Sequence, residues 1–207
     1  QLLRDPKVHL LAILAAQAGF TVTLIDGQPA TGANATDTRT FAVVRGSWRL
    51  LRATGIGPEL ADQTTPLNGL DAQDGGTHWF GAPHAAFSAD DLDRDANGEP
   101  LGQMVPAGAL QAALDRRTAE VPGLTWLRGA RFSGMTTGPA GAEISLEDGR
   151  MVRAGLVAAC DGIHSAVRNS LGLRTEGRSY GKSVFAADVA LSRPHHGIAR
   201  QLFTPEG

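Results

Sequence analysis

The stretch GLVAACDGIHSAVR, residues 155–168, constrains the fold of this chain more than any other. It begins with a short apolar run, Leu156–Cys160, that is bounded by polar residues and too short for an independent helix, which predicts a buried strand. Asp161-Gly162 follows it, and glycine allows a tight turn because it carries no Cβ.

A helix is predicted to follow, because apolar residues recur at helical intervals from Ile163 to Leu171, with Ser165 or His164 in the opening turn. A strand, an Asp-Gly corner and a helix start can form a ligand shelf at the carboxyl end of a sheet. A plain strand–turn–helix corner with no ligand is the alternative that these residues alone leave open.

Composition excludes several classes of protein. The chain has 207 residues, 42% of them hydrophobic and 19% charged, which is an ordinary globular mix. A net charge of −2 gives no electrostatic footprint for nucleic acid. Cys160 is the single cysteine, so no disulfide framework is expected and the composition fits a reducing compartment. No apolar run reaches membrane-spanning length, and no metal-ligand spacing is present.

The first part of the chain suggests half of a dinucleotide-binding unit. Residues 8–18 are apolar nearly all round, which predicts a buried helix, and Gly19 ends it. Residues 20–26 are β-branched and apolar and end on an acid, which predicts a strand. In such units the acid at the strand end, here Asp26, accepts hydrogen bonds from a ribose. An acid at a strand end is also common in other α/β proteins.

The glycine-rich loop of such a unit is missing from its expected place. Leu3–Val8 precedes the helix and contains no glycine, although that loop needs glycines for close backbone approach to a diphosphate. Asp5 would place a negative charge beside the diphosphate, and Lys7 is the one favourable member. Either the cofactor is held poorly, or this terminus is not the native loop. Because Gln1 is not a natural start, we expect a fragment of a longer protein.

The middle of the chain predicts mixed elements. Residues 41–54 predict an amphipathic helix with Arg45, Arg49 and Arg52 along one side, and Arg39 just before it is a candidate phosphate or flavin contact or else an exposed loop arginine. The acidic run Asp90–Asp95 predicts a solvated loop. Helix is predicted over 106–121; strands are predicted around 69–72, 77–80, 86–88 and 124–128, a meander over 132–135, 142–146 and 151–153, and further strands over 180–191 and within 193–207.

The order of these elements predicts an α/β fold, namely a parallel sheet with an added β-meander. Four segments together resemble the class A FAD-dependent aromatic hydroxylases, which share the fold of p-hydroxybenzoate hydroxylase, and most narrowly the ubiquinone-biosynthesis hydroxylases of polyprenylated phenols. The segments are AAQAGFTVTLID, TDTRTFAVVRGSWRLLRATGI, LEDGRMVRAGLVAACDGIHSAVR and YGKSVFAADVALSRPHHGIARQLFTPEG.

This resemblance implies a domain plan and site residues. A Rossmann-like FAD-binding domain would comprise residues 1–68 and 103–178, with residues 69–102 as an excursion into the substrate domain and 179–207 as the start of that domain's sheet. Asp26 would bind the adenosine ribose, Arg39 would lie near the flavin and its diphosphate, and the Phe132 backbone would meet the adenine. Asp161 and Gly162 would form the Asp-Gly motif that serves FAD and the nicotinamide donor, and Arg168 would close it.

The implied chemistry is reduction of FAD by NAD(P)H, followed by transfer of one atom of O₂ to an activated phenol ring. No catalytic acid or base is assigned. The Pro106-Ala107-Gly108 segment departs from the polar residues usual in the family, and the second flavin motif is expected beyond residue 207. We therefore expect the 207-residue chain to bind FAD weakly or not at all and not to hydroxylate.

Two other functions stay open. One is a non-catalytic relative that serves as a scaffold for pathway partners or a prenylated intermediate. The other is a different FAD-linked reductase of the same superfamily. The resemblance implies an aromatic or polyprenyl-phenol substrate, O₂ and ubiquinone-pathway proteins as partners, and no nucleic acid. It implies a cytoplasmic location, with peripheral contact at the inner membrane face left open.

Overall fold

A computed structural model describes residues 6–28, 39–76, 82–92 and 98–205 of the chain. The chain divides into two compact units, each built from two separate stretches of sequence. Unit 1 comprises residues 1–37 and 111–185, and unit 2 comprises residues 38–110 and 186–207. In the described part of the chain, no helix combines the length and the apolar character needed to cross a bilayer.

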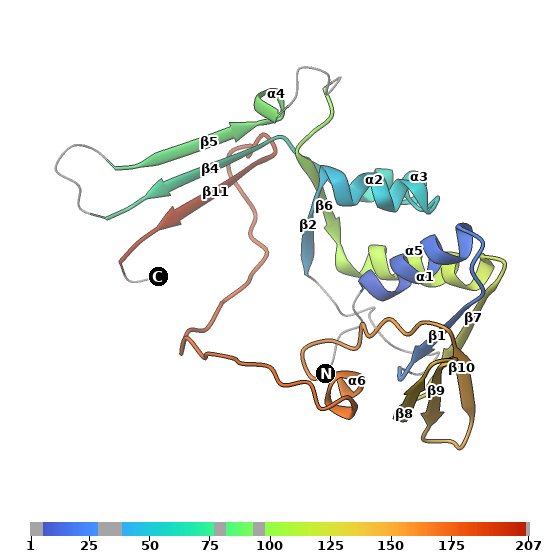
Figure 1. The fold of residues 1–207 in the computed structure, drawn as a ribbon. Helices are drawn as coiled ribbons and strands as arrows, with labels where there is room; N and C mark the ends of the chain where they lie inside the picture. The colour runs from blue at the N-terminus through green and yellow to red at the C-terminus, as the bar shows by residue number, and fades with distance from the viewer. Residues whose placement is uncertain (1–5, 29–38, 77–81, 93–97, 206–207) are drawn as a thin grey trace. The chain divides into compact units, whose positions relative to one another are not determined.

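Unit 1 has a parallel pair of strands at its centre (Figure 1). Strands β1 (Val22–Asp26) and β7 (Leu124–Arg128) pair in parallel, with Asp26 opposite Arg128 at their carboxyl ends. Helix α1 (Pro6–Gln17) packs on both strands. Side chains alternate between the two faces of a strand, so this parallel pair has a helix on one face and a second layer on the other.

The second layer of unit 1 is an antiparallel meander in the order β10-β9-β8. Its buried centre is Ala130, Ile144 and Leu146, and Ile25 of β1 and Leu127 of β7 pack against it. The parallel strands and the meander therefore share one apolar layer. The meander strands are β8 (Phe132–Gly138), β9 (Gly141–Leu146) and β10 (Met151–Ala154).

Among the residues that the structure describes, unit 2 contains two three-stranded sheets, in the orders β2-β6-β3 and β11-β4-β5. In the second, β4 and β5 form an antiparallel pair, and β11 joins β4 in parallel although it lies near the end of the chain. The strands are β2 (Thr40–Val44), β3 (Thr65–Leu67), β4 (Gly69–Asp74), β5 (His84–Ser88), β6 (Gly102–Pro106) and β11 (Ile198–Phe203).

Short helices and one long helix complete the elements. Helix α5 continues from strand β6 and belongs partly to each unit. These elements are α2 (Arg45–Ala53), α3 (Gly57–Leu60), the 3₁₀ turn η1 (Ala61–Gln63), α4 (Ala89–Leu92), α5 (Ala107–Glu120) and α6 (Ala166–Ser170).

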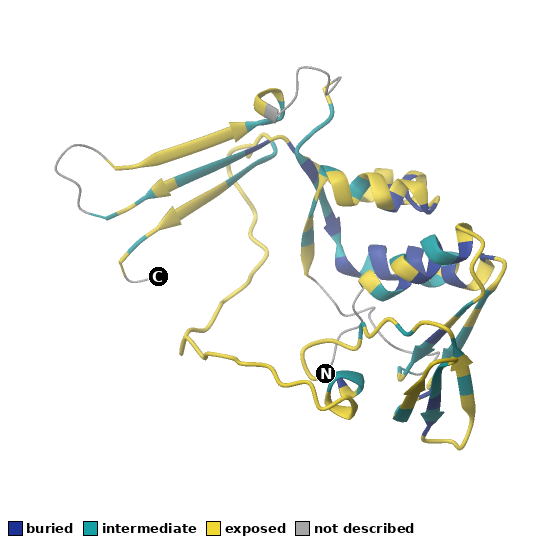
Figure 2. Cartoon of the chain, in the orientation of Figure 1, coloured by how far each residue is buried: buried dark blue, intermediate teal, exposed yellow. Residues whose placement is uncertain are grey.

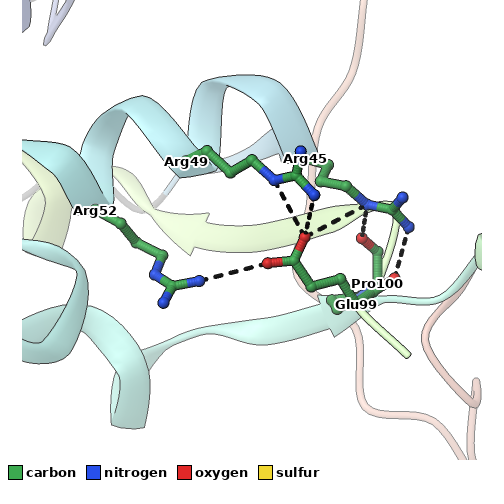
Figure 3. Close-up of polar contacts among 5 residues, drawn as sticks. All are labelled: Arg45, Arg49, Arg52, Glu99 and Pro100. Carbon is green, nitrogen blue, oxygen red and sulfur yellow. Dashed lines mark hydrogen bonds and ion pairs between the residues drawn. The ribbon is translucent and has the colours of Figure 1, made fainter. Parts of the chain in front are cut away.

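Helix α2 is attached to the segment before β6 by three arginines that converge on Glu99 (Figure 3). Arg49 donates two hydrogen bonds to one carboxylate oxygen, at 3.2 and 2.8 Å, and Arg52 lies 3.4 Å from the other oxygen. Arg45, with only 13% of its side chain exposed, bonds the main-chain oxygens of Glu99 and Pro100 at 2.6 and 3.0 Å. The predicted basic side of this helix is thus a structural contact.

The fold class is confirmed, and several elements lie where the sequence predicts them. The helices over 8–18 and 106–121, the strands over 20–26 and 124–128, the meander, and the strand within 193–207 all form. Strands also form around 69–72 and 86–88. The strand predicted over 77–80 lies outside the described residues.

Three predictions about elements are wrong. Residues 40–44 form strand β2 rather than the first turn of a helix, because they pair with β6, which the sequence did not reveal. No strand forms over Leu156–Cys160, where Leu156 is 86% exposed and Val157 alone packs against the meander. No strand forms over Tyr180–Leu191, which Figure 2 shows as exposed throughout.

The errors at Leu156–Cys160 and Tyr180–Leu191 share a cause. An apolar run becomes a strand only when a neighbouring strand supplies hydrogen-bond partners, and the described residues pair no strand with either segment. Two smaller differences concern helix bounds. The helix predicted from residue 163 starts later, at Ala166, and the described part of the acidic run includes the short helix α4.

Candidate functional site

The carboxyl ends of β1 and β7 form one edge of the parallel pair in unit 1. Asp26 ends β1, and one of its carboxylate oxygens accepts a hydrogen bond from the Gln28 N–H at 2.9 Å. The main-chain oxygen of Gln28 in turn accepts from the Gly129 N–H at 2.9 Å. The turns that follow the two strands are therefore fastened together. This edge is where α/β folds bind nucleotides, with a strand-end acid on the ribose.

Arg128 lies next to Asp26 on this edge, because the two residues are opposite partners in the strand register. Its guanidinium carbon lies 3.6 Å from the centroid of the Trp126 ring, a close cation–π contact. Neither Trp126 nor Arg128 stands out in the sequence as a site residue. An aromatic residue and an arginine two positions apart on a predicted strand share one face, and that spacing is the signal that was available.

Phe132 begins the meander close to the same edge. It pairs with Leu146 of β9 and packs, half-buried, against the apolar centre of the meander. The Arg131 main-chain oxygen accepts from the Glu147 N–H at 2.9 Å, which anchors the segment between β7 and β8. The structure thus brings the segments that carry Asp26 and Phe132 together through the Gln28–Gly129 bond.

The Asp-Gly corner forms as the sequence predicts. Gly162 has a φ of +84°, in the left-handed region that favours glycine. The Asp161 carboxylate accepts from the Ser165 hydroxyl and from the Val167 N–H at 3.2 Å. Its two oxygens therefore hold the start of helix α6.

Ser165 is the N-cap of α6, and its buried side chain accepts from the Arg168 N–H at 2.9 Å. The Arg168 guanidinium donates to the Ile163 main-chain oxygen at 2.8 Å, so the corner and the helix close into one hydrogen-bonded motif. Burial raises the pKa of Asp161, but the hydrogen bonds from Ser165 and Val167 outweigh burial and hold this pKa below its ordinary value of 3.8.

Arg39 belongs to unit 2, next to strand β2. Its main-chain oxygen accepts from the Ala107 N–H at 2.8 Å, where β6 passes into α5, and its guanidinium carbon lies 5.5 Å from the Phe41 ring centroid. Of Leu3–Val8, which occupies the place of the glycine loop, residues 3–5 lie outside the described residues and residues 6–8 begin helix α1. Lys7 lies in the first turn of α1.

Comparison with known proteins gives the family context of this geometry. Residues 8–201 match the family described as FAD binding domain. Ubiquinone hydroxylase UbiL of Rhodospirillum rubrum is 33% identical over 199 residues, covering 95% of this chain and 44% of the relative. The 3-demethoxyubiquinol 3-hydroxylase of Escherichia coli is 29% identical over 201 residues, covering 95% of this chain and 49% of the relative.

Solved structures agree on the fold. PqsL of Pseudomonas aeruginosa, described as a probable FAD-dependent monooxygenase, superimposes with a TM-score of 0.64 at 19% identity, covering 83% of this chain and 44% of PqsL. At this identity the likeness establishes the fold alone. The chain spans about half the length of the curated relatives it matches.

Proposed function

Because the chain belongs to the FAD binding domain family, we propose that it is part of a FAD-dependent monooxygenase that hydroxylates a polyprenylated phenol in ubiquinone biosynthesis. FAD is the cofactor of the family, as the sequence predicts. The observation that carries the proposal is the 33% identity to a ubiquinone hydroxylase across 95% of this chain. NAD(P)H as electron donor remains a prediction.

The described residues fit the adenosine end of FAD. Asp26 stands at the carboxyl end of a parallel strand, and the turn after it is bonded to the turn after β7, which gives a ribose a fixed acceptor. In this proposal Asp26 binds the ribose and the Phe132 backbone meets the adenine. When bound, FAD supplies the oxygen-activating redox chemistry, and the protein orients it.

The remaining predicted site residues have separate roles. Asp161 and Gly162 keep the turn in place, and Arg168 presents a partly exposed guanidinium beside it. In this proposal that motif serves the flavin and the nicotinamide donor, while Arg39 serves the diphosphate. Residues 1–68 and 103–178 provide the FAD-binding part, and residues 69–102 and 179–207 belong to the substrate part.

The lack of glycines in Leu3–Val8 supports weak cofactor binding by these 207 residues. The test is to titrate the purified chain with FAD while following flavin fluorescence, and then to supply NAD(P)H, O₂ and a polyprenylated phenol. We expect FAD binding that is weak or absent, with any weak binding reduced further by Asp26→Asn, and no hydroxylated product from this chain alone. Stoichiometric yellow protein on purification would contradict the weak binding.

The same experiment separates the other functions. A chain that binds no flavin but retains a prenylated phenol would support the non-catalytic scaffold. Oxidation of NAD(P)H stimulated by quinones and not by phenols would support a different FAD-linked reductase. Either result would overturn the proposed hydroxylase.

A further inference from the structure

Arg128 is a cation at the predicted nucleotide edge whose side chain makes no ion pair with the residues that the structure describes. It is the last residue of β7, it is exposed, and within the described part of the chain no carboxylate lies within ion-pair distance of it. Its register partner Asp26 ends the neighbouring strand, so both residues emerge at the same edge and on the same face. A single strand spacing separates the backbones of Asp26 and Arg128.

The guanidinium is held in a defined orientation. It stacks 3.6 Å from the centroid of the Trp126 ring. The Trp126 ring is in turn contacted edge-on by His9 of α1, with centroids 4.8 Å apart and planes at 82°. His9 is completely buried, with Nδ1 3.0 Å from the Thr118 hydroxyl of α5. The stack therefore rests on the interior of unit 1, and little side-chain entropy is left for a ligand to remove.

The covalent structure of FAD indicates what such a guanidinium would meet. A ribose bound at Asp26 carries adenine on C1′ and the diphosphate on C5′, so the two groups leave the sugar at opposite ends. Adjacent strands lie about 4.8 Å apart. An adenine attached to a ribose at Asp26 is therefore long enough to reach the end of the neighbouring strand, where Arg128 stands. The turns after β1 and β7 are bonded through Gln28 and Gly129, so the spacing between the two strand ends is maintained.

We infer that Arg128 stacks its guanidinium on the adenine ring of FAD and makes this edge select FAD over FMN, which lacks adenosine. Trp126 is the positioning residue, because its ring stacks against the Arg128 guanidinium and holds its orientation. A planar, delocalised cation suits an aromatic base better than a compact ammonium group does. This inference rests on the proposed function and names a residue of the same site that the sequence did not reveal.

The test compares FAD with FMN in four chains: the unchanged chain, Arg128→Ala, Arg128→Lys and the control Arg153→Gln. Arg153 is an 85% exposed arginine paired with Glu143 on the meander, away from this edge. Flavin fluorescence gives both affinities. We expect Arg128→Ala to weaken FAD binding about tenfold with FMN binding unchanged. Arg128→Lys should lose nearly as much FAD affinity, because lysine keeps the positive charge but lacks the planar guanidinium. Arg153→Gln should keep the FAD affinity of the unchanged chain.

Three results would overturn the inference: unchanged FAD affinity in Arg128→Ala, unchanged FAD affinity in Arg128→Lys, or a fall in the FMN affinity of Arg128→Ala as large as the fall in its FAD affinity. A titration with AMP, followed by amide NMR shifts, separates this failure from failure of the proposed function. If no chain binds a flavin, AMP replaces the two flavins as the probe, and the proposed function is judged by the phenol and NAD(P)H experiment described above. AMP binding that depends on Arg128 would then still support the adenine contact, and its absence would overturn it.

Discussion

Nδ1 of His9 in α1 lies 3.0 Å from the hydroxyl oxygen of Thr118 in α5, and neither side chain is exposed by more than 1%. The Thr118 hydroxyl already donates its one proton to the Leu114 main-chain oxygen at 2.7 Å. The contact therefore requires His9 to donate from Nδ1, which assigns the tautomer. One buried hydrogen bond thus joins the two long helices of the chain.

Removing the acceptor should destabilise the chain. Thr118→Val keeps the shape of the side chain but removes the hydroxyl oxygen that accepts from the buried His9 Nδ1–H. We therefore expect a loss of about 1–3 kcal/mol in the free energy of unfolding. Urea denaturation followed by circular dichroism measures it. Thr125→Val, at an exposed strand position, is the matched control and should change little. Equal midpoints for the two variants would show that the bond contributes nothing.

The arginine cluster on Glu99 predicts an acid-sensitive contact. Hydrogen bonding from Arg49 lowers the pKa of Glu99 and outweighs burial, which raises it, and the charges of all three arginines lower it further. A depressed folded pKa adds stability above the ordinary value of 4.5, and this stability is lost as the pH falls through the folded value. Glu99→Gln should therefore lower the unfolding midpoint at pH 7, and the deficit should shrink below pH 4.5.

Salt gives a second check of the same contact, because the arginines at its rim are exposed. The deficit of Glu99→Gln should also shrink in 1 M NaCl, where the Debye length is about 3 Å. Glu147→Gln, at an exposed position on the other unit, provides the comparison. A deficit independent of both pH and salt would mean that packing, and not charge, holds α2 to this segment.

The cap of α6 predicts a small but specific loss. Ser165→Ala removes the acceptor of the Arg168 N–H and the donor to Asp161, so we expect about 1 kcal/mol of destabilisation, which Ser165→Thr should restore. The pKa of Asp161 should rise toward 3.8 in Ser165→Ala, and a carboxyl NMR titration reads it directly. Any stability from Asp161 is present above 3.8 and disappears as the pH falls through its folded pKa. An unchanged titration curve would refute this role of Ser165.

Gly197 is the residue at which β11 reaches β4. It has a φ of +70°, and a Cβ there would lie 2.6 Å from both the Pro66 oxygen and the Asn68 side chain. We expect Gly197→Ala to cost more than the roughly 1–2 kcal/mol of a left-handed alanine and to speed amide exchange in β11. Gly155→Ala, where a Cβ meets open space, is the control. Protection in β11 equal to that of the control would contradict the expectation.

Local patterns predicted much of the fold. The nearly all-apolar Ala-Leu helix at 8–18 and the β-branched strand ending at Asp26 both form, because each is specified by its own residues. Strand β2 was misassigned as helix, because its decisive contact is a partner strand far along the chain. Leu156–Cys160 failed for the opposite reason: its pattern is that of a buried strand, but no described strand pairs with it.

In the candidate site, too, the features with local sequence signals were predicted and those that depend on distant contacts were not. Asp26 and the Asp161-Gly162 corner stand out in sequence, because strand ends and Asp-Gly turns have local signals. The use of the Asp161 carboxylate to hold its own helix was not foreseen, since it depends on the geometry of the turn. Arg128 was missed because its position beside Asp26 follows from the parallel register of two strands that are far apart in the chain.

The parallel pairing of β11 with β4 has a consequence for synthesis of the protein. A ribosome delivers β4 and β5 early, then all of residues 111–185, and only afterwards the strand that completes their sheet. Until then one edge of β4 is an open template in the nascent polypeptide, of the kind that recruits foreign strands. Chaperone holding of the growing chain during that interval would protect this edge until β11 emerges.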